Sequence, residues 1–203
     1  MMIRPEAEKD WREVEKLTRE AFWNKYRPGC MEHYVLHCYR SRPEFVKELD
    51  YVAEEDGRIV AHIMYSHARI MADDGRTIPI LIFGPVSVLP EKQGQGIGSR
   101  LIRYTLELAE QRGCGAVAIT GDPDYYHRFG FVSGSALGVY YDGIPREEEA
   151  PFFMVKELKQ GFLRGITGVY SDPEGYLVDD DQVEAFDAAF PPKEKKKLPG
   201  QLV

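Results

Sequence analysis

The clearest pattern along the chain is a helical spacing of apolar residues between residues 97 and 112. The positions at this spacing are Leu101, Ile102, Thr105, Leu108 and Ala109. Arginines and glutamates take the remaining positions, so the segment is predicted to be an amphipathic helix. Gly113 stands where a helix commonly ends, and the apolar run 116–120 after it is typical of a buried strand that pairs in parallel.

Similar patterns predict the other elements. Helices are expected at 6–22, 32–38 and around 183–190, and strands at 2–4, 51–53, 58–65, 67–71, 77–88, 136–141 and 152–156, with 161–170 extended. The turn sequences at 55–57 and 73–76 contain Asp-Gly, which indicates two hairpins. The aspartates at 179–181 favour a helix N-terminus over a metal site.

The strand at 77–88 leads into a glycine-rich turn at 93–98. Pro79, Gly84 and Pro85 lie within this strand, so a bulge or a splayed end is expected. Strand, helix and strand then form a βαβ unit, with the turn at the start of the helix. Unpaired amides and the positive end of the helix dipole favour anions at such a position. The turn is therefore a candidate phosphate site.

Composition narrows the class of protein. A chain of 203 residues with 43% hydrophobic and 29% charged residues fits one globular domain with a self-sufficient core. No apolar run approaches the roughly 20 residues of a membrane span, and the first residues lack an apolar signal region. We therefore expect a cytoplasmic protein without a membrane partner.

The cysteines and the net charge also limit what the protein is expected to bind. Cys30, Cys38 and Cys114 form no C-x-x-C pair, and His33 and His37 have no further ligand at a metal spacing, so we expect neither disulfides nor a bound metal. The net charge of −7 disfavours nucleic acid. The lysines at 193–197 are interpreted as a solvated stretch within a flexible tail, residues 191–203.

Three kinds of phosphate-binding turn can be compared with residues 93–98. A P-loop needs Lys-Ser/Thr after its last glycine, whereas Ser99-Arg100 follows Gly98 here. A dinucleotide fold needs G-x-G-x-x-G, whereas these glycines are spaced two by two. The remaining pattern is Q-x-x-G-x-G, preceded by Val86-Ser87-Val88.

This pattern resembles the cofactor motif of the GNAT superfamily of acyl-CoA N-acetyltransferases. The segments 84–90, 121–126 and 128–131 are similar to its bacterial YhbS-like branch. The resemblance implies an α/β (α+β) fold with a mixed, mostly antiparallel, twisted sheet of about seven strands, flanking helices and a central βαβ cofactor unit. It implies an acetyltransferase domain at 1–156, with 157–203 as an extension packed on the same domain.

The resemblance also implies a site for acetyl-CoA. Its expected cofactor-binding residues are Val86, Ser87, Val88, Gln93, Gly94, Gln95, Gly96, Ile97, Gly98 and Ser99. Tyr126 matches the tyrosine that protonates the departing thiolate in many family members, and a phenol is an adequate acid for that step. The alternative is an ordinary packed tyrosine beside Tyr125 and Phe129.

The general base has no clear candidate, because the strand at 78–83 contains no acid. His62, His67 and His127 are weaker candidates. The expected activity is acetyl transfer from acetyl-CoA to a primary amine by direct attack in a ternary complex, since no cysteine lies in the motif. The alternative is a non-catalytic acyl-CoA-binding regulatory module, and a third possibility is a nucleotide-binding protein. The sequence does not identify the amine, which is either a small molecule or peptidyl. It also does not decide between a monomer and a homodimer.

Overall fold

The computed structural model describes residues 1–201, which belong to two compact units. The first unit contains residues 1–64, 85–102 and those from Glu174 onward. The second contains residues 65–84 and 103–173. Both units are therefore assembled from segments that are distant in the sequence.

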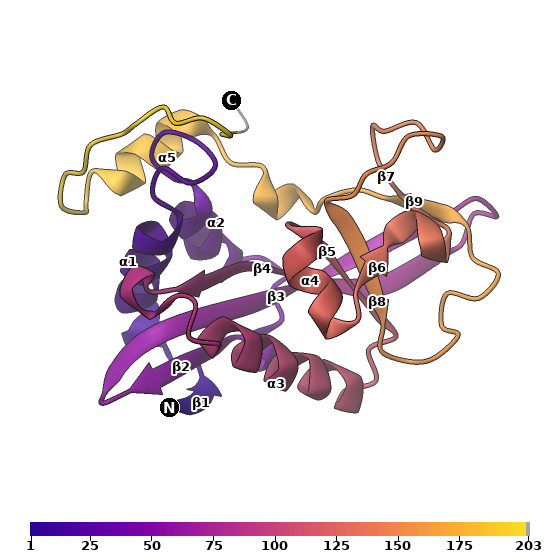
Figure 1. Ribbon diagram of the computed structural model, residues 1–203, viewed down its shortest axis with the longest axis horizontal. Helices are drawn as coiled ribbons and strands as arrows, with labels where there is room; N and C mark the ends of the chain where they lie inside the picture. Colours follow the sequence, from indigo (N-terminus) through magenta and orange to yellow (C-terminus); the bar gives the residue numbers. More distant parts are fainter. Residues whose placement is uncertain (202–203) are drawn as a thin grey trace. The chain divides into compact units, whose positions relative to one another are not determined.

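The first unit combines antiparallel strands with three complete helices and with residues 97–102, the start of a fourth. Strand β1 (Met2–Pro5) pairs with β2 (Tyr51–Glu55), which pairs with the first part of β3 (Arg58–Ala72). The helices α1 (Trp11–Phe22), α2 (Glu32–Tyr39) and α5 (Asp180–Asp187) belong to the same unit (Figure 1). Short 3-10 helices lie at Glu8–Asp10, Lys47–Leu49, Pro90–Lys92 and Glu174–Tyr176.

The second unit contains two pairs of parallel strands. Strand β4 (Thr77–Val88) pairs in parallel with β5 (Ala116–Thr120), and β5 pairs antiparallel with β8 (Phe153–Glu157). The other pairs are β3 with β4, β8 with β6 (Val132–Ser133), the end of β3 with β9 (Gly168–Tyr170), and β9 with β7 (Val139–Tyr141), of which the last is also parallel. The helices are α4 (Pro123–Tyr126), the second part of α3 (Ile97–Gln111), and 3-10 helices at His127–Phe129 and Gly134–Leu137.

The hydrogen-bonded strands follow the order β1-β2-β3-β4-β5-β8-β6, with β7 and β9 off this path. Most neighbours are antiparallel, and α3 connects the parallel strands β4 and β5, which confirms the predicted α/β class and the βαβ unit. The described residues form nine strands where about seven were predicted. One reason is that β6 has two residues, too few to show an alternating pattern.

Two predicted segments differ from the structure. The strands expected at 58–65 and 67–71 are one strand, β3, because Ser66 is buried within it while His67 and Arg69 keep the outward-facing alternation. The strand expected at 136–141 begins only at Val139 and follows a 3-10 helix that ends at Leu137 and is capped by Gly138, where φ is +75°. Both errors come from polar or glycine residues that interrupt the apolar pattern.

The strongest sequence predictions are confirmed. In α3 the predicted core positions Leu101, Ile102, Thr105 and Ala109 are buried. At the start of α5, the carboxylate of Asp179 accepts a hydrogen bond from the amide of Gln182 at 3.1 Å, so the aspartate run does cap a helix. No helix formed by residues 1–201 combines the length and apolar character needed to cross a bilayer.

Candidate functional site

The glycine-rich turn lies in the first unit, between the end of β4 and the start of α3. Gly94 and Gly96 have φ values of +73° and +80°, where residues with a side chain are strained. A Cβ atom added at either position would meet no atom of the chain within 4 Å. The turn therefore needs glycine for its backbone conformation, and the space beside it is open.

The fold leaves the backbone amides of this turn without acceptors among residues 1–201. Within residues 1–201, the backbone N–H groups of residues 94–98 have no hydrogen-bond acceptor, and the first bond of α3 across the turn is from Arg100 to Gly96, at 3.0 Å. Several unpaired amides at a helix N-terminus form a concave donor set that suits a phosphate or pyrophosphate. The chain can thus hold an anion here through its backbone.

The side chains of the motif stabilise the turn itself. The amide group of Gln93 donates to the carbonyl of Val88 at 3.0 Å, and that of Gln95 donates to the carbonyl of Glu91 at 3.0 Å. The buried hydroxyl of Ser87 donates to Thr18 Oγ1 at 2.9 Å. These three side chains are committed to the fold, so the positions can offer a ligand mainly their backbone.

The basic residues near the turn differ in their availability. Lys92 pairs with Glu55 at 2.8 Å, and Arg58 pairs with Glu91 at 3.0 Å. Arg100, in the first turn of α3, is exposed and has no ion pair within residues 1–201. Sequence reasoning missed Arg100, although a basic residue just after the glycine turn was a usable signal.

The strand before the turn has the expected irregularity. Gly84 takes a φ of +147°, which favours glycine, and Pro85 follows it. The parallel register between β4 and β5 includes Leu81 and Ile82 and does not reach Gly84. In β4 the residues from Ile80 to Phe83 are all buried and apolar, so no acid is available there as a base.

Tyr126 lies in the second unit, at the end of the short helix α4. Asp122 caps this helix by accepting from the amide of Asp124 at 3.0 Å, and Pro123 fits its first turn. The Tyr126 ring lies 6.0 Å from both Phe83 and Phe131. A Cβ atom on Gly121 would lie 2.5 Å from Tyr126 Cε2. The sequence around Tyr126 therefore fixes the position of its ring by close packing.

The three histidines weighed as bases lie in different surroundings. His67 and His127 are exposed. His62 is fully buried, and its Nε2 lies 2.7 Å from a carboxylate oxygen of Asp50. Burial lowers the pKa of His62 to about 4, so it is neutral at physiological pH. None of these placements assigns the base.

His62 belongs to a buried polar cluster, defined by Glu6, Asp50, His62 and Arg40. One ligand-type atom of each of the first three residues lies within 4.8 Å of the others. Arg40 donates to both carboxylate oxygens of Glu6, at 2.7 and 3.1 Å, so a positive charge already occupies the cluster. Burial raises the pKa of Glu6 to about 7 and that of Asp50 to about 6. We interpret the cluster as a buried ionic network that belongs to the fold and in which the carboxyl groups keep their protons to a higher pH than usual.

The cluster predicts how stability depends on pH. Between pH 4.5 and about 7, Glu6 holds a proton in the folded state that the unfolded chain has released, so its contribution to stability falls as pH rises. Glu6→Gln removes this titration while keeping an acceptor for Arg40. Urea unfolding at a series of pH values should show wild type losing stability relative to the variant across this window. Parallel profiles for the two proteins would contradict the assignment.

The strand order, the parallel β4–β5 pair and the glycine turn at the start of α3 together define an acyltransferase of the GNAT fold. The structure is similar to crystal structures of the Escherichia coli GNAT N-acetyltransferase YhbS in complex with CoA and of a Brucella melitensis GNAT acetyltransferase in complex with acetyl-CoA. The first has a TM-score of 0.74 and 25% identity, covering 86% of this chain and 91% of YhbS. The second has a TM-score of 0.68 and 28% identity, covering 87% and 97%.

Residues 2–133 match the family model described as an acetyltransferase (GNAT) domain. The chain belongs to the GNAT acetyltransferase family. It is also 37% identical over 84 residues to the uncharacterized N-acetyltransferase YjhQ of Escherichia coli K12, across 41% of this chain and 45% of YjhQ. The match thus spans less than half of that curated relative.

Proposed function

We propose that the protein transfers an acetyl group from acetyl-CoA to a primary amine by direct attack in a ternary complex. The observation that carries the proposal is the set of unpaired amides at residues 94–98, at the start of α3. Family membership and the CoA and acetyl-CoA in the similar structures support the same ligand. The missing acid in β4 is the observation that favours the alternative, a non-catalytic acyl-CoA-binding module.

Each part of the site would have a separate task. Acetyl-CoA supplies an activated thioester. The amides of residues 94–98 bind the pyrophosphate, with Arg100 adding positive charge, and the remaining cofactor-binding positions, Val86, Ser87, Val88, Gln93 and Ser99, line the rest of the ligand. Tyr126 donates a proton to the departing thiolate. The amine nitrogen forms a bond to the acetyl carbon, the C–S bond breaks, and the proton lost by the amine passes to solvent, from which Tyr126 is reprotonated.

We also propose that residues 1–156 form the acetyltransferase domain and that 157–203 extend it. In support, residues 157–173 belong to the second unit, and the following residues belong to the first. The extension is thus divided between units that the preceding chain also builds. It does not gather into a compact unit of its own among residues 1–201.

We call the proposed phosphate site at the amides of residues 94–98 the phosphate cradle. It is tested by Gly96→Ala, with Gly57→Ala as its matched control. Both glycines have a positive φ, +80° and +76°, and open space around them, so both variants should lose roughly 1 kcal/mol of stability. Only Gly96 lies in the cradle. Titration calorimetry should therefore show about tenfold weaker CoA binding for Gly96→Ala and wild-type affinity for Gly57→Ala.

Comparison ligands separate the competing functions. Wild type should bind CoA more tightly than ATP or NAD, since the turn lacks the P-loop lysine and the third dinucleotide glycine. Equal losses of CoA affinity in the two glycine variants would contradict the proposal that the amides of residues 94–98 bind the CoA phosphates. CoA binding without CoA release on any amine of a broad panel would favour the non-catalytic module.

A further inference from the structure

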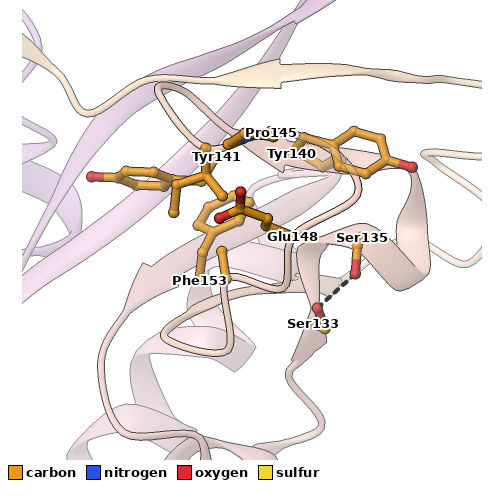
Figure 2. A pocket seen from close by; sticks show the side chains of 10 residues that line it. Ser133, Ser135, Tyr140, Tyr141, Pro145, Glu148 and Phe153 are labelled. Carbon is orange, nitrogen blue, oxygen red and sulfur yellow. Dashed lines mark hydrogen bonds between the residues drawn. The ribbon is translucent and has the colours of Figure 1, made fainter.

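A small pocket lies wholly within the second unit and shares no residue with the glycine turn. It is enclosed by β6, the 3-10 helix after it, β7, the loop at 142–150 and the start of β8 (Figure 2). Its lining includes the hydroxyls of Ser133 and Ser135, which share a hydrogen bond of 2.9 Å. Its free volume is about 10 Å³, which is room for a group the size of one water molecule.

Aromatic rings in fixed orientations form much of this pocket. Phe153 is 1% exposed and stacks on Tyr170, with ring centroids 4.9 Å apart. Tyr141 lies 5.5 Å from Phe153, and its hydroxyl donates to Asp172. Burial, followed by this hydrogen bond, raises the pKa of Tyr141, so the phenol stays neutral. The pocket therefore presents apolar π surfaces that cannot themselves neutralise a cation.

The charge in the pocket comes from Glu148. Glu148 is an exposed residue of the loop that lines the pocket together with Phe153 and Tyr141, and Figure 2 draws its carboxylate in front of the Phe153 ring. Within residues 1–201, the Glu148 carboxylate has no hydrogen bond or ion pair, whereas Arg146 of the same loop is bound to Asp73 at 2.6 and 2.8 Å. An uncompensated carboxylate beside aromatic rings favours a small cation such as an ammonium group.

The loop that carries Glu148 is held in place. Arg146 also lies over the Tyr140 ring, 4.9 Å from its centroid, and the amide of Glu148 donates to the carbonyl of Pro145 at 3.0 Å. At the start of the loop, the carboxylate of Asp142 accepts from the hydroxyl of Ser171 at 2.8 Å. These contacts fix the loop before any ligand binds, which lowers the entropic cost of binding.

The pocket is connected to Tyr126 through two neighbouring strands. Phe153 pairs with Thr120 across β8 and β5, and the amide of Gly121 donates to the carbonyl of Phe152 at 2.8 Å. Tyr126 in turn packs directly against Gly121. A group in the pocket is thus held at a fixed position relative to the proposed thiolate acid, and both lie in the same unit.

We propose that this pocket binds an ammonium group of the acceptor, so that the acceptor carries a second amine besides the one that is acetylated. The inference rests on the proposed function and specifies its substrate class as diamines and related polycations. Glu148 supplies the opposite charge, and the rings supply the π surfaces. The small free volume admits an ammonium head and excludes a bulky group.

The test compares putrescine with butylamine, which has the same chain length and lacks the second amine. In Glu148→Gln, putrescine binding measured by calorimetry on the CoA-saturated protein should weaken about tenfold, and the KM for putrescine should rise in parallel. Butylamine kinetics should be unchanged. Glu147→Gln and Glu149→Gln remove a charge from the same exposed run outside the pocket lining, and both should behave as wild type.

The outcomes separate this inference from the function on which it rests. If CoA binds and amines are acetylated but all three glutamate variants retain the preference for putrescine over butylamine, the pocket is not the ammonium site. If all three weaken putrescine equally, the effect is general surface charge and the inference is also wrong. Failure of wild type to bind CoA would instead overturn the proposed function, and the putrescine titration, repeated on the protein without CoA, would still report on Glu148.

Discussion

Tyr126→Phe should lower kcat by about 100-fold, because it removes the proposed proton donor for the thiolate. CoA affinity should stay at the wild-type level, since the expected phosphate contacts are backbone amides at residues 94–98. The measurement is CoA release from acetyl-CoA, detected as free thiol, with the best amine of a panel. Calorimetry with CoA supplies the binding control.

The substitution is well matched to its surroundings. The neighbours of Tyr126 include Phe83, Phe131 and Gly121, and all three contact its ring. Phenylalanine keeps that ring and removes one oxygen, so the packing that orients α4 is retained. A loss of kcat without a loss of folding or CoA affinity would therefore report on chemistry.

Tyr125→Phe is the internal control for this experiment. Tyr125 is adjacent in sequence, and its ring lies 5.1 Å from that of Tyr126. The guanidinium carbon of Arg128 lies over the Tyr125 ring, 4.8 Å from its centroid. Its hydroxyl has no role in the proposed reaction, so kcat should remain near that of wild type. A Tyr126→Phe kcat within threefold of wild type would leave Tyr126 as a packing residue.

Local sequence signals predicted the region around the glycine turn well. The 3.6-residue spacing in α3 identified buried positions such as Leu101 and Ala109, because one amphipathic helix sets its own pattern. The glycines at 94 and 96 marked a backbone conformation that few other residues adopt. The helix cap at Asp179 could also be predicted from the sequence, because it joins two residues only three positions apart.

Contacts between distant segments could not be predicted from such signals. Glu148 lies in a loop that the sequence identifies only as polar, and its place in a pocket depends on β6, β7 and β8 coming together. Asn24 is a second example. Its side-chain oxygen accepts from the amide of Lys196 at 3.0 Å, and its side-chain nitrogen donates to the carbonyl of Glu194 at 3.0 Å. Nothing in either segment alone indicates this contact.

The buried side of α1 shows the same limit and leads to the second large effect. Arg19 is a charged residue in an amphipathic helix, and such residues are expected at the surface. In the structure it is 1% exposed and bound to Asp187 of α5, 168 positions away, at 2.6 and 3.0 Å. Its guanidinium carbon lies 4.2 Å from the centroid of the Trp23 ring. A segment at the other end of the chain thus covers this face.

Arg19→Met should lower the free energy of unfolding by about 3–5 kcal/mol, because it leaves the Asp187 carboxylate in a site without its cation. His33 does not supply a second cation in the wild-type protein: its Nε2 lies 3.0 Å from Asp187, but burial lowers its pKa to about 4. The measurement is urea unfolding at neutral pH. Arg12→Met is the control on the same helix, with a side chain 53% exposed, and should cost at most about 1 kcal/mol.

A double variant separates the loss of an ion pair from the loss of packing. Arg19→Met combined with Asp187→Leu removes both charges and keeps apolar volume between α1 and α5, so it should recover much of the stability lost in the single variant. If Arg19→Met costs no more than Arg12→Met, the buried pair does not hold α5 against α1. If the double variant is as unstable as the single one, packing and not the uncompensated carboxylate accounts for the loss.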